Sequence, residues 1–202
     1  MEVVNHKEEV PFAHYQGLFQ AADPAEIHRR LPGISFDGEA FSLTLLGKNY
    51  HIACPGGTVT AADGGEPPLP TRTFLLRYLL EGKEASWGGG WKTFREMPWG
   101  EMYIGPYTGR VLTRAAFSFG ARVEAFRAAC EKMGATPVSH GDAGFLFDFL
   151  WPYAMQILVW AGDDEFPPSA QVLYSDNFAD GFAAEDRVVA GDLLISAIKA
   201  NL

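Results

Sequence analysis

Three consecutive carboxylates, Asp163, Asp164 and Glu165, are the densest group of chemically active side chains in the sequence. Phe166 and the pair Pro167-Pro168 follow directly, and together these residues are called the acidic loop. Each proline fixes its own φ and pushes the preceding residue towards an extended conformation, so few loop conformations remain. Adjacent carboxylates repel one another and need water, a cation or a basic side chain nearby. The loop is therefore either a rigid solvated turn, with Phe166 plugging the core, or a pre-arranged carboxylate site.

The catalytic candidates are Asp164 and Glu165. They could act as a general acid and base or as metal ligands if one of them had a raised pKa in a cleft. Their spacing does not match a calcium-binding loop, and we predict no metal and no cofactor. The sequence leaves open whether the protein is an enzyme.

Charge is distributed unevenly along the chain. Between residues 163 and 192 Arg187 is the only basic residue, whereas residues 72–132 hold most of the arginines and lysines. An arginine fork matches a carboxylate with two parallel hydrogen bonds, so we predict that the acidic loop docks on this central region, with Arg95 as a partner. Such a junction would be a structural tie or would hold a polar ligand. The predicted ligand-binding residues are Trp91, Phe94, Arg95, Asp163, Asp164, Glu165 and Phe166.

Other sequence motifs exclude several classes of chemistry. The chain has no nucleotide-binding glycine motif, no nucleophile elbow and no paired histidines at zinc-protease spacing. The glycines of residues 88–90, between Trp87 and Trp91, lack the lysine and helix of a phosphate-binding loop. They are expected to let two indoles approach a surface or a ligand. Cys54 and Cys130 cannot form a four-cysteine metal site and are predicted to be buried thiols.

The composition favours a folded protein that binds neither nucleic acid nor membranes. Apolar residues make up 48% of the chain, which is enough for a core, and the net charge is −9. A nucleic-acid-binding protein usually carries a basic stripe, and a membrane helix needs a far longer apolar run than any present here. The first ten residues lack the features of a secretion signal, so we expect a cytoplasmic protein. Nothing in the sequence sets its oligomeric state.

The elements that must position these residues follow from periodicity and turn signals. Residues 155–160 form an apolar run typical of a buried strand, and residues 145–151 alternate with one aromatic face. Residues 41–45 alternate and are expected to form a half-buried strand, and further strands are expected at residues 50–54, 58–60 and 170–174. Helices are expected at residues 12–22, from Pro24 with Asp23 as its N-terminal cap, from Thr71, at 111–119, at 123–133 and at 185–200. Residues 86–107 have no clear period and contain either a lid or an unrecognised element.

These elements predict an α+β fold with antiparallel sheets and packed helices. We treat residues 1–202 as a single α+β domain. The order of elements also suggests two similar α-β-β-β-α halves, residues 11–85 and 108–202, joined by the Trp/Gly-rich segment 86–107. In that arrangement the cleft between the halves would be the natural pocket.

Several motifs together resemble the bacterial and archaeal "domain of unknown function 3786" family. They are Tyr78-Leu79-Leu80, the stretch Trp91-Lys92-Thr93-Phe94-Arg95-Glu96, Asp142, Pro152, Asp164-Glu165-Phe166-Pro167 and Glu185-Asp186. The resemblance covers about residue 23 to the C-terminus. The chain departs from the family pattern at Ser175, where an aspartate is usual, and has Asp176 one place later.

The resemblance implies a setting in anaerobic redox or one-carbon metabolism. Some relatives carry a fused four-cysteine iron–sulfur domain that this chain lacks, so a cluster would belong to a partner. Our leading expectation is an accessory module that binds a small-molecule or cofactor-like ligand. The alternatives are an enzyme that uses the acidic loop and an interaction module that docks an iron–sulfur protein through the Trp-rich segment. Exposed indoles would favour docking.

Overall fold

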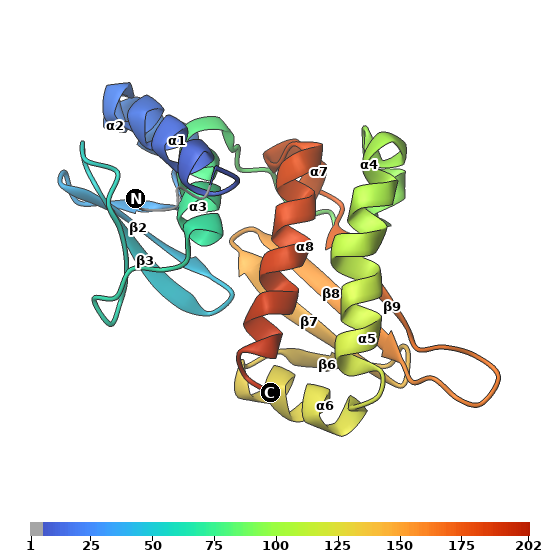
Figure 1. Cartoon of the computed structure of the whole chain (residues 1–202). Coiled ribbons are helices and arrows are strands. Elements are labelled where there is room, and N and C mark those ends of the chain that lie inside the picture. Colours follow the sequence, from blue (N-terminus) through green and yellow to red (C-terminus); the bar gives the residue numbers. More distant parts are fainter. Residues whose placement is uncertain (1–5) are drawn as a thin grey trace. The chain divides into compact units, whose positions relative to one another are not determined.

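The computed structural model describes residues 6–202. Residues 1–5, half of the stretch on which the prediction of no secretion signal rests, lie outside this range. The chain divides into two compact units, Met1–Glu84 and Ala85–Leu202 (Figure 1). Both combine helices with antiparallel strands, which confirms the α+β fold.

The first unit is a small antiparallel sheet with three helices. Its strands pair in the order β1, β2, β3, β4. The elements are α1 (Glu9–Ala21), α2 (Pro24–Arg30), β1 (Ser35–Phe36), β2 (Ala40–Leu45), β3 (Lys48–Ala53), β4 (Val59–Ala61) and α3 (Leu69–Glu81). The burial of Phe41, Leu43 and Leu45 on β2 confirms the predicted half-buried strand.

Two polar side chains set the helix ends of this unit. The Asp23 carboxylate accepts a hydrogen bond from the Ala25 N–H at 2.9 Å, as predicted for the cap that begins α2. At the other end of α2 the Arg30 guanidinium donates to the carbonyls of Leu79 (2.6 Å), Leu80 (2.9 Å) and Gly82. These carbonyls lack partners within α3, so Arg30 both caps α3 and fastens α2 to it.

The second unit contains a larger antiparallel sheet. Its strands pair in the order β6, β7, β8, β9, β5. The strands are β5 (Trp91–Thr93), β6 (Thr136–Val138), β7 (Ala143–Leu150), β8 (Tyr153–Trp160) and β9 (Ser169–Ser175). The helical elements are η1 (Phe94–Glu96), α4 (Gly100–Tyr107), η2 (Thr108–Thr113), α5 (Arg114–Phe119), α6 (Val123–Lys132), α7 (Phe178–Gly181) and α8 (Ala184–Lys199).

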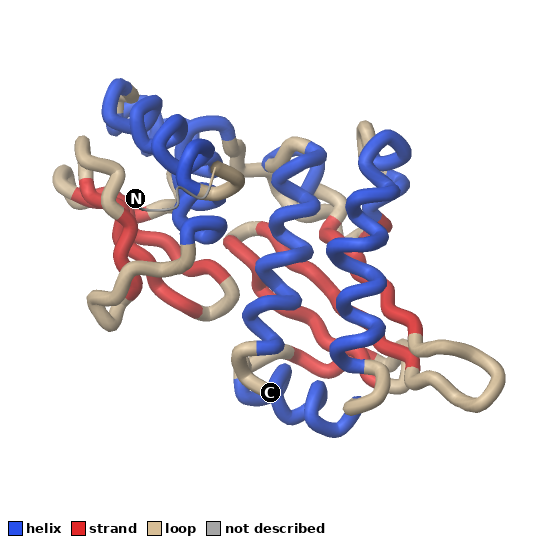
Figure 2. Tube along the Cα trace, in the orientation of Figure 1, coloured by secondary structure: helices blue, strands red, loops and turns tan. Residues whose placement is uncertain are grey.

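The core of the second unit lies between this sheet and two long helical segments. One segment is the helical run from α4 through η2 to α5, and the other is α8. The two lie side by side across one face of β7, β8 and β9 (Figures 1 and 2). On one face of β8, Met155, Ile157 and Val159 are fully buried. On the other face, Ala154 and Leu158 are nearly fully buried, which confirms a strand covered on both faces. The predicted aromatic face of β7 is confirmed for Phe145, Phe147 and Phe149, which are buried, but not for Trp151, which follows the strand in a turn and is 65% exposed.

The Trp/Gly-rich segment of residues 86–107 contains elements that the sequence did not reveal. It supplies β5, η1 and α4 to the second unit. The helix predicted at residues 111–119 therefore begins much earlier, at Gly100, and passes through the wider π-helical turns of η2. In both units a helix is followed by four strands and a helix, one strand more than the predicted repeat, and a true duplication remains a prediction.

Within the described range, no helix has the length and apolar character needed to span a membrane. Nor do residues 6–202 bring together three or more side chains that could ligate a metal ion.

Candidate functional site

The acidic loop joins β8 to β9 and is organised by its own first carboxylate. Asp163 accepts hydrogen bonds from the N–H groups of Phe166 (2.7 Å) and Glu165 (2.9 Å), and its N–H donates to the Phe166 carbonyl at 2.9 Å. The backbone hydrogen bond from Phe166, followed by that from Glu165, lowers the pKa of Asp163. Asp163 is therefore the residue that shapes the loop.

The loop points into solvent rather than onto the central arginines. Asp163, Asp164 and Glu165 are exposed, and none of the three forms an ion pair with any residue in the described part of the chain. Arg95 pairs instead with Glu101 at 3.2 Å, and both of these side chains are mostly exposed. The tie predicted between the loop and Arg95 is not formed. The catalytic role of Asp164 and Glu165 stays a prediction.

The base of the loop is held by packing and by Asp142. The Asp142 carboxylate accepts a hydrogen bond from the Ala161 N–H at 2.8 Å, and Pro168 lies so close to Gly120 that a Cβ there would come within 2.3 Å of it. Phe166 is 67% exposed, so the alternative in which it plugs the core is wrong. The loop residue that packs against the rest of this unit is Pro168, which contacts Gly120 directly after α5.

The glycine run before Trp91 is explained by Asp176. Its carboxylate accepts hydrogen bonds from the N–H groups of Gly88 and Gly90, both at 2.9 Å, and these bonds lower its pKa. A Cβ on Gly88 or Gly90 would lie within 2.8 Å of this carboxylate, so a side chain there would push the carboxylate away from its two hydrogen bonds. Trp87 and Trp91 meet edge to face, with ring centroids 5.0 Å apart. Gly88 and Gly90 thus bind a carboxylate of the protein itself, that of Asp176.

Phe94 lies in the core beneath a buried arginine. It is 1% exposed and stacks on Tyr107 with ring centroids 4.0 Å apart. Arg187, on α8, is 2% exposed, and its guanidinium lies 5.7 Å from the Phe94 ring centroid. Burial lowers the pKa of Arg187. Because Phe94 is buried while Arg95 is exposed, these two predicted ligand-binding residues face different environments, and their joint role stays a prediction.

Arg187 holds the turn that precedes α4. Its Nη2 donates to the Pro98 carbonyl at 2.5 Å and its Nε to the Ala183 carbonyl at 3.4 Å. The next residue, Trp99, has φ of 64°, a left-handed conformation that is unusual for a residue with a large side chain. A Cβ on Gly100 would come within 2.2 Å of the Phe94 carbonyl oxygen. Arg187 and the backbone of Phe94 therefore fix the path of the chain at residues 98–100.

The result is an exposed apolar stripe, which we call the α4 face: Trp99, Met102, Tyr103 and Pro106. Pro106 follows Met102 by four residues and Tyr103 by three, which places these side chains on one side of α4, and Trp99 is the residue that caps its start. Trp99 is 68% exposed, Met102 72% and Tyr103 39%. Large apolar side chains gathered on one surface are typical of an interaction site. Local constraints thus hold this face towards solvent.

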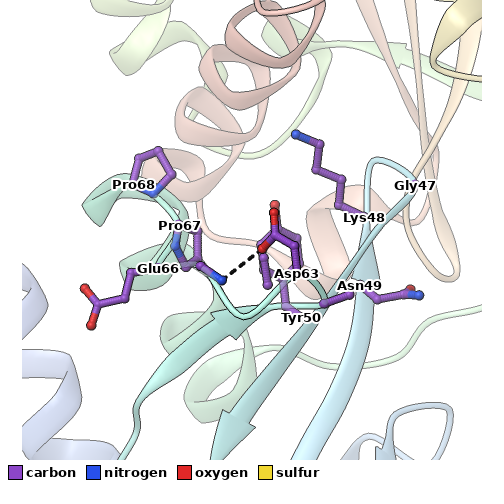
Figure 3. Close-up of a pocket in the computed structure, with 11 residues that line it drawn as sticks. Gly47, Lys48, Asn49, Tyr50, Asp63, Glu66, Pro67 and Pro68 are labelled. Carbon is purple, nitrogen blue, oxygen red and sulfur yellow. Dashed lines mark hydrogen bonds between the residues drawn. The ribbon is translucent and has the colours of Figure 1, made fainter.

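The first unit contains a separate hollow of about 520 Å³ beside the β3–β4 edge. Tyr50, Ala61, Ala62, Pro67 and Pro68 provide its apolar lining, and Lys48, Asn49, Asp63 and Glu66 its polar groups. In Figure 3 the Lys48 and Asp63 side chains rise on the same side of the strands, whereas Glu66 and Asn49 point away. Its size is within the range of small-molecule pockets.

Comparison with protein families gives a match that covers most of the chain. The model of a domain of unknown function, DUF3786, matches residues 23–197. The chain belongs to this family. Among the curated proteins no match to this DUF3786 chain was found, and none was found among the solved structures.

Sequence reasoning identified the Trp-rich segment but not the surface that it forms. The spacing of Trp99, Met102, Tyr103 and Pro106 was a helical signal in the sequence, obscured by Gly100 and Gly105 within the same stretch. The pocket of the first unit was missed because its charged members sit in turns, where charge usually indicates only solvation.

Proposed function

We propose that the chain is an accessory module that docks a partner protein through the α4 face. The observation that carries the proposal is the exposed Trp99 and Met102 on a segment fixed by buried Arg187. Aromatic residues and methionine are enriched in the cores of protein interfaces, and a preformed surface loses less conformational entropy on binding. A helix bearing such anchors at this spacing fits an apolar groove on another protein.

The charge of the chain favours a protein as the occupant over a membrane. The net charge is −9, which opposes approach to anionic lipid, and the rim of the α4 face carries the opposite charges of Arg95 and Glu101. A rim with both signs suits the polar edge of a protein interface.

The class of partner comes from the family resemblance. Relatives that carry a fused four-cysteine iron–sulfur domain suggest that this chain meets an iron–sulfur protein as a separate chain, in anaerobic redox or one-carbon metabolism. The free thiols Cys54 and Cys130 are consistent with a reducing, cytoplasmic setting.

The test is calorimetric titration of the chain with the purified four-cysteine iron–sulfur domain of a fused family member. Trp99→Ala should weaken binding by about tenfold or more, the usual effect of removing an aromatic anchor. Phe117→Ala is the matched control, because Phe117 on α5 is also 68% exposed but lies outside the α4 face.

Two results would overturn the proposal. One is equal binding by wild type, Trp99→Ala and Phe117→Ala. The other is a chain that binds no iron–sulfur domain but self-associates in light scattering, or binds neutral lipid vesicles, through Trp99. Either outcome would assign the α4 face to a second copy or to a lipid surface.

A further inference from the structure

The hollow of the first unit has two opposite charges with no ionic partner. Lys48 and Asp63 both line it, and in the part of the chain that the structure describes neither side chain forms an ion pair. Asp63 uses one carboxylate oxygen, Oδ1, to accept a hydrogen bond from the Gly65 N–H at 2.9 Å (Figure 3). Its second oxygen is left for another donor.

Glu66, the third charged residue that lines the hollow, already has an ionic partner. The Glu66 carboxylate pairs with Arg72 at 3.0 Å, and its side chain points away from the hollow (Figure 3). Asn49 likewise uses its side-chain oxygen to accept a hydrogen bond from Thr44 at 2.6 Å. The unbalanced charges are thus one ammonium and one carboxylate.

The walls between these charges are apolar and stiff. Tyr50 is 7% exposed and pairs across the strands with Ala61. Burial raises the pKa of Tyr50, and the Asp63 carboxylate raises it further, so the phenol remains protonated at neutral pH. Two backbone hydrogen bonds close the turn that contains Asp63, from Gly64 N–H to Ala61 O (2.8 Å) and from Ala61 N–H to Gly65 O (2.8 Å). Pro67 and Pro68 restrict the chain that follows.

We infer that this hollow binds a small zwitterion, with the ligand carboxylate on Lys48, its ammonium on Asp63 and its carbon chain against Tyr50 and the prolines. A ligand with one charge would leave the other protein charge without a partner, whereas a zwitterion satisfies both with charge-assisted hydrogen bonds. The volume of about 520 Å³ accommodates an amino acid with an aliphatic side chain. This site is independent of the α4 face.

Four five-carbon probes test this inference: norvaline, δ-aminovalerate, valerate and amylamine. The first two are zwitterions that differ in the separation of their charges, and the others carry one charge each. Backbone amide shifts from Lys48 to Gly65 would be followed by NMR in the full chain. At least one zwitterion should give saturable shifts there, with affinity at least about tenfold above that of valerate and amylamine, since each charge-assisted bond contributes on that scale.

Variants identify the contacts. Asp63→Asn should reduce the advantage of the zwitterion over valerate, and Lys48→Met its advantage over amylamine. Glu39→Gln, an exposed carboxylate of the same unit outside the hollow, should change neither. The spectra also report whether each variant folds, and the probe series on the wild-type chain needs no variant. No saturable shift with either zwitterion, or equal affinity for valerate or amylamine, would overturn the inference.

Discussion

Asp176 and Gly90 are hydrogen-bonded in both directions. The Asp176 carboxylate accepts a hydrogen bond from the Gly90 N–H at 2.9 Å, and the Asp176 N–H donates to the Gly90 carbonyl at 3.0 Å. The Trp87 indole N–H donates to the same carbonyl at 2.9 Å. Gly90 thus brings the indole and the carboxylate together at the edge of the sheet.

Gly90→Ala should destabilise the protein because the added methyl would lie 2.7 Å from the Asp176 carboxylate. The carboxylate would have to move and give up its hydrogen bond from the Gly90 N–H, so we expect a lower unfolding midpoint in urea. Gly17→Ala is the matched control: no atom lies within 4 Å of a Cβ there, and the residue is exposed inside α1. It should gain about 0.5–1 kcal/mol. Equal effects of the two substitutions would contradict this account.

The same carboxylate predicts a pH dependence. The pKa of Asp176 is lowered by the Gly88 and Gly90 hydrogen bonds, so the folded state binds its proton less readily than the unfolded state does. Its contribution to stability is complete above the ordinary aspartate pKa and is lost as pH falls through the lowered value. An NMR titration of the Asp176 carboxyl should give a pKa below 3.8. Asp176→Asn should remove this acid-dependent part of the unfolding curve.

Arg187→Lys should loosen the start of α4. The shorter reach of an ammonium cannot keep the bonds to both Pro98 and Ala183, and a buried polar group without partners costs about 1–3 kcal/mol. Chemical denaturation would measure the loss, and Trp99 fluorescence the change at the α4 face. In Arg95→Lys, where the side chain is 62% exposed, the change should stay within about 0.5 kcal/mol. Comparable losses in both variants would argue against a special role for Arg187.

Asp163→Ala should disorder the acidic loop, whereas Asp164→Ala should not. Asp163 accepts the N–H groups of Glu165 and Phe166, while Asp164 has no ion pair within residues 6–202. Amide hydrogen exchange at Phe166 should accelerate only in Asp163→Ala. Unchanged exchange in that variant would mean that the prolines alone fix the loop.

The two thiols should differ in reactivity. Cys130 is fully buried, and burial raises its pKa well above that of a free thiol. Cys54 is partly exposed, with a pKa raised mainly by burial. A thiol reagent at neutral pH should label Cys54 slowly and Cys130 only on unfolding. Rapid labelling of Cys130 in the native protein would show that α6 opens locally.

The sequence was most informative where a local pattern decides the structure. The alternating phenylalanines of β7 and the Asp23 cap of α2 are local signals, and both predictions are confirmed. The bond between Gly90 and Asp176 spans 86 residues, and no periodicity in either segment indicates it. Nor could spacing show that Phe94 lies in the core against the buried Arg187 while Arg95, the next residue after Phe94, lies in solvent.

The wide turns of η2 set the angular orientation of everything before them in the helix. An α-helix advances about 100° per residue, and a π-type turn accommodates one extra residue. Deleting a single residue between Thr108 and Thr113 would return η2 to α-helical turns and leave both Trp99 and α5 facing as they do now. A one-residue deletion within α4 would instead turn Trp99 relative to α5 by about 100° and pull the start of the helix away from Arg187. The wide turns are therefore the one place in this helical run where the chain can lose a residue without redirecting the indole.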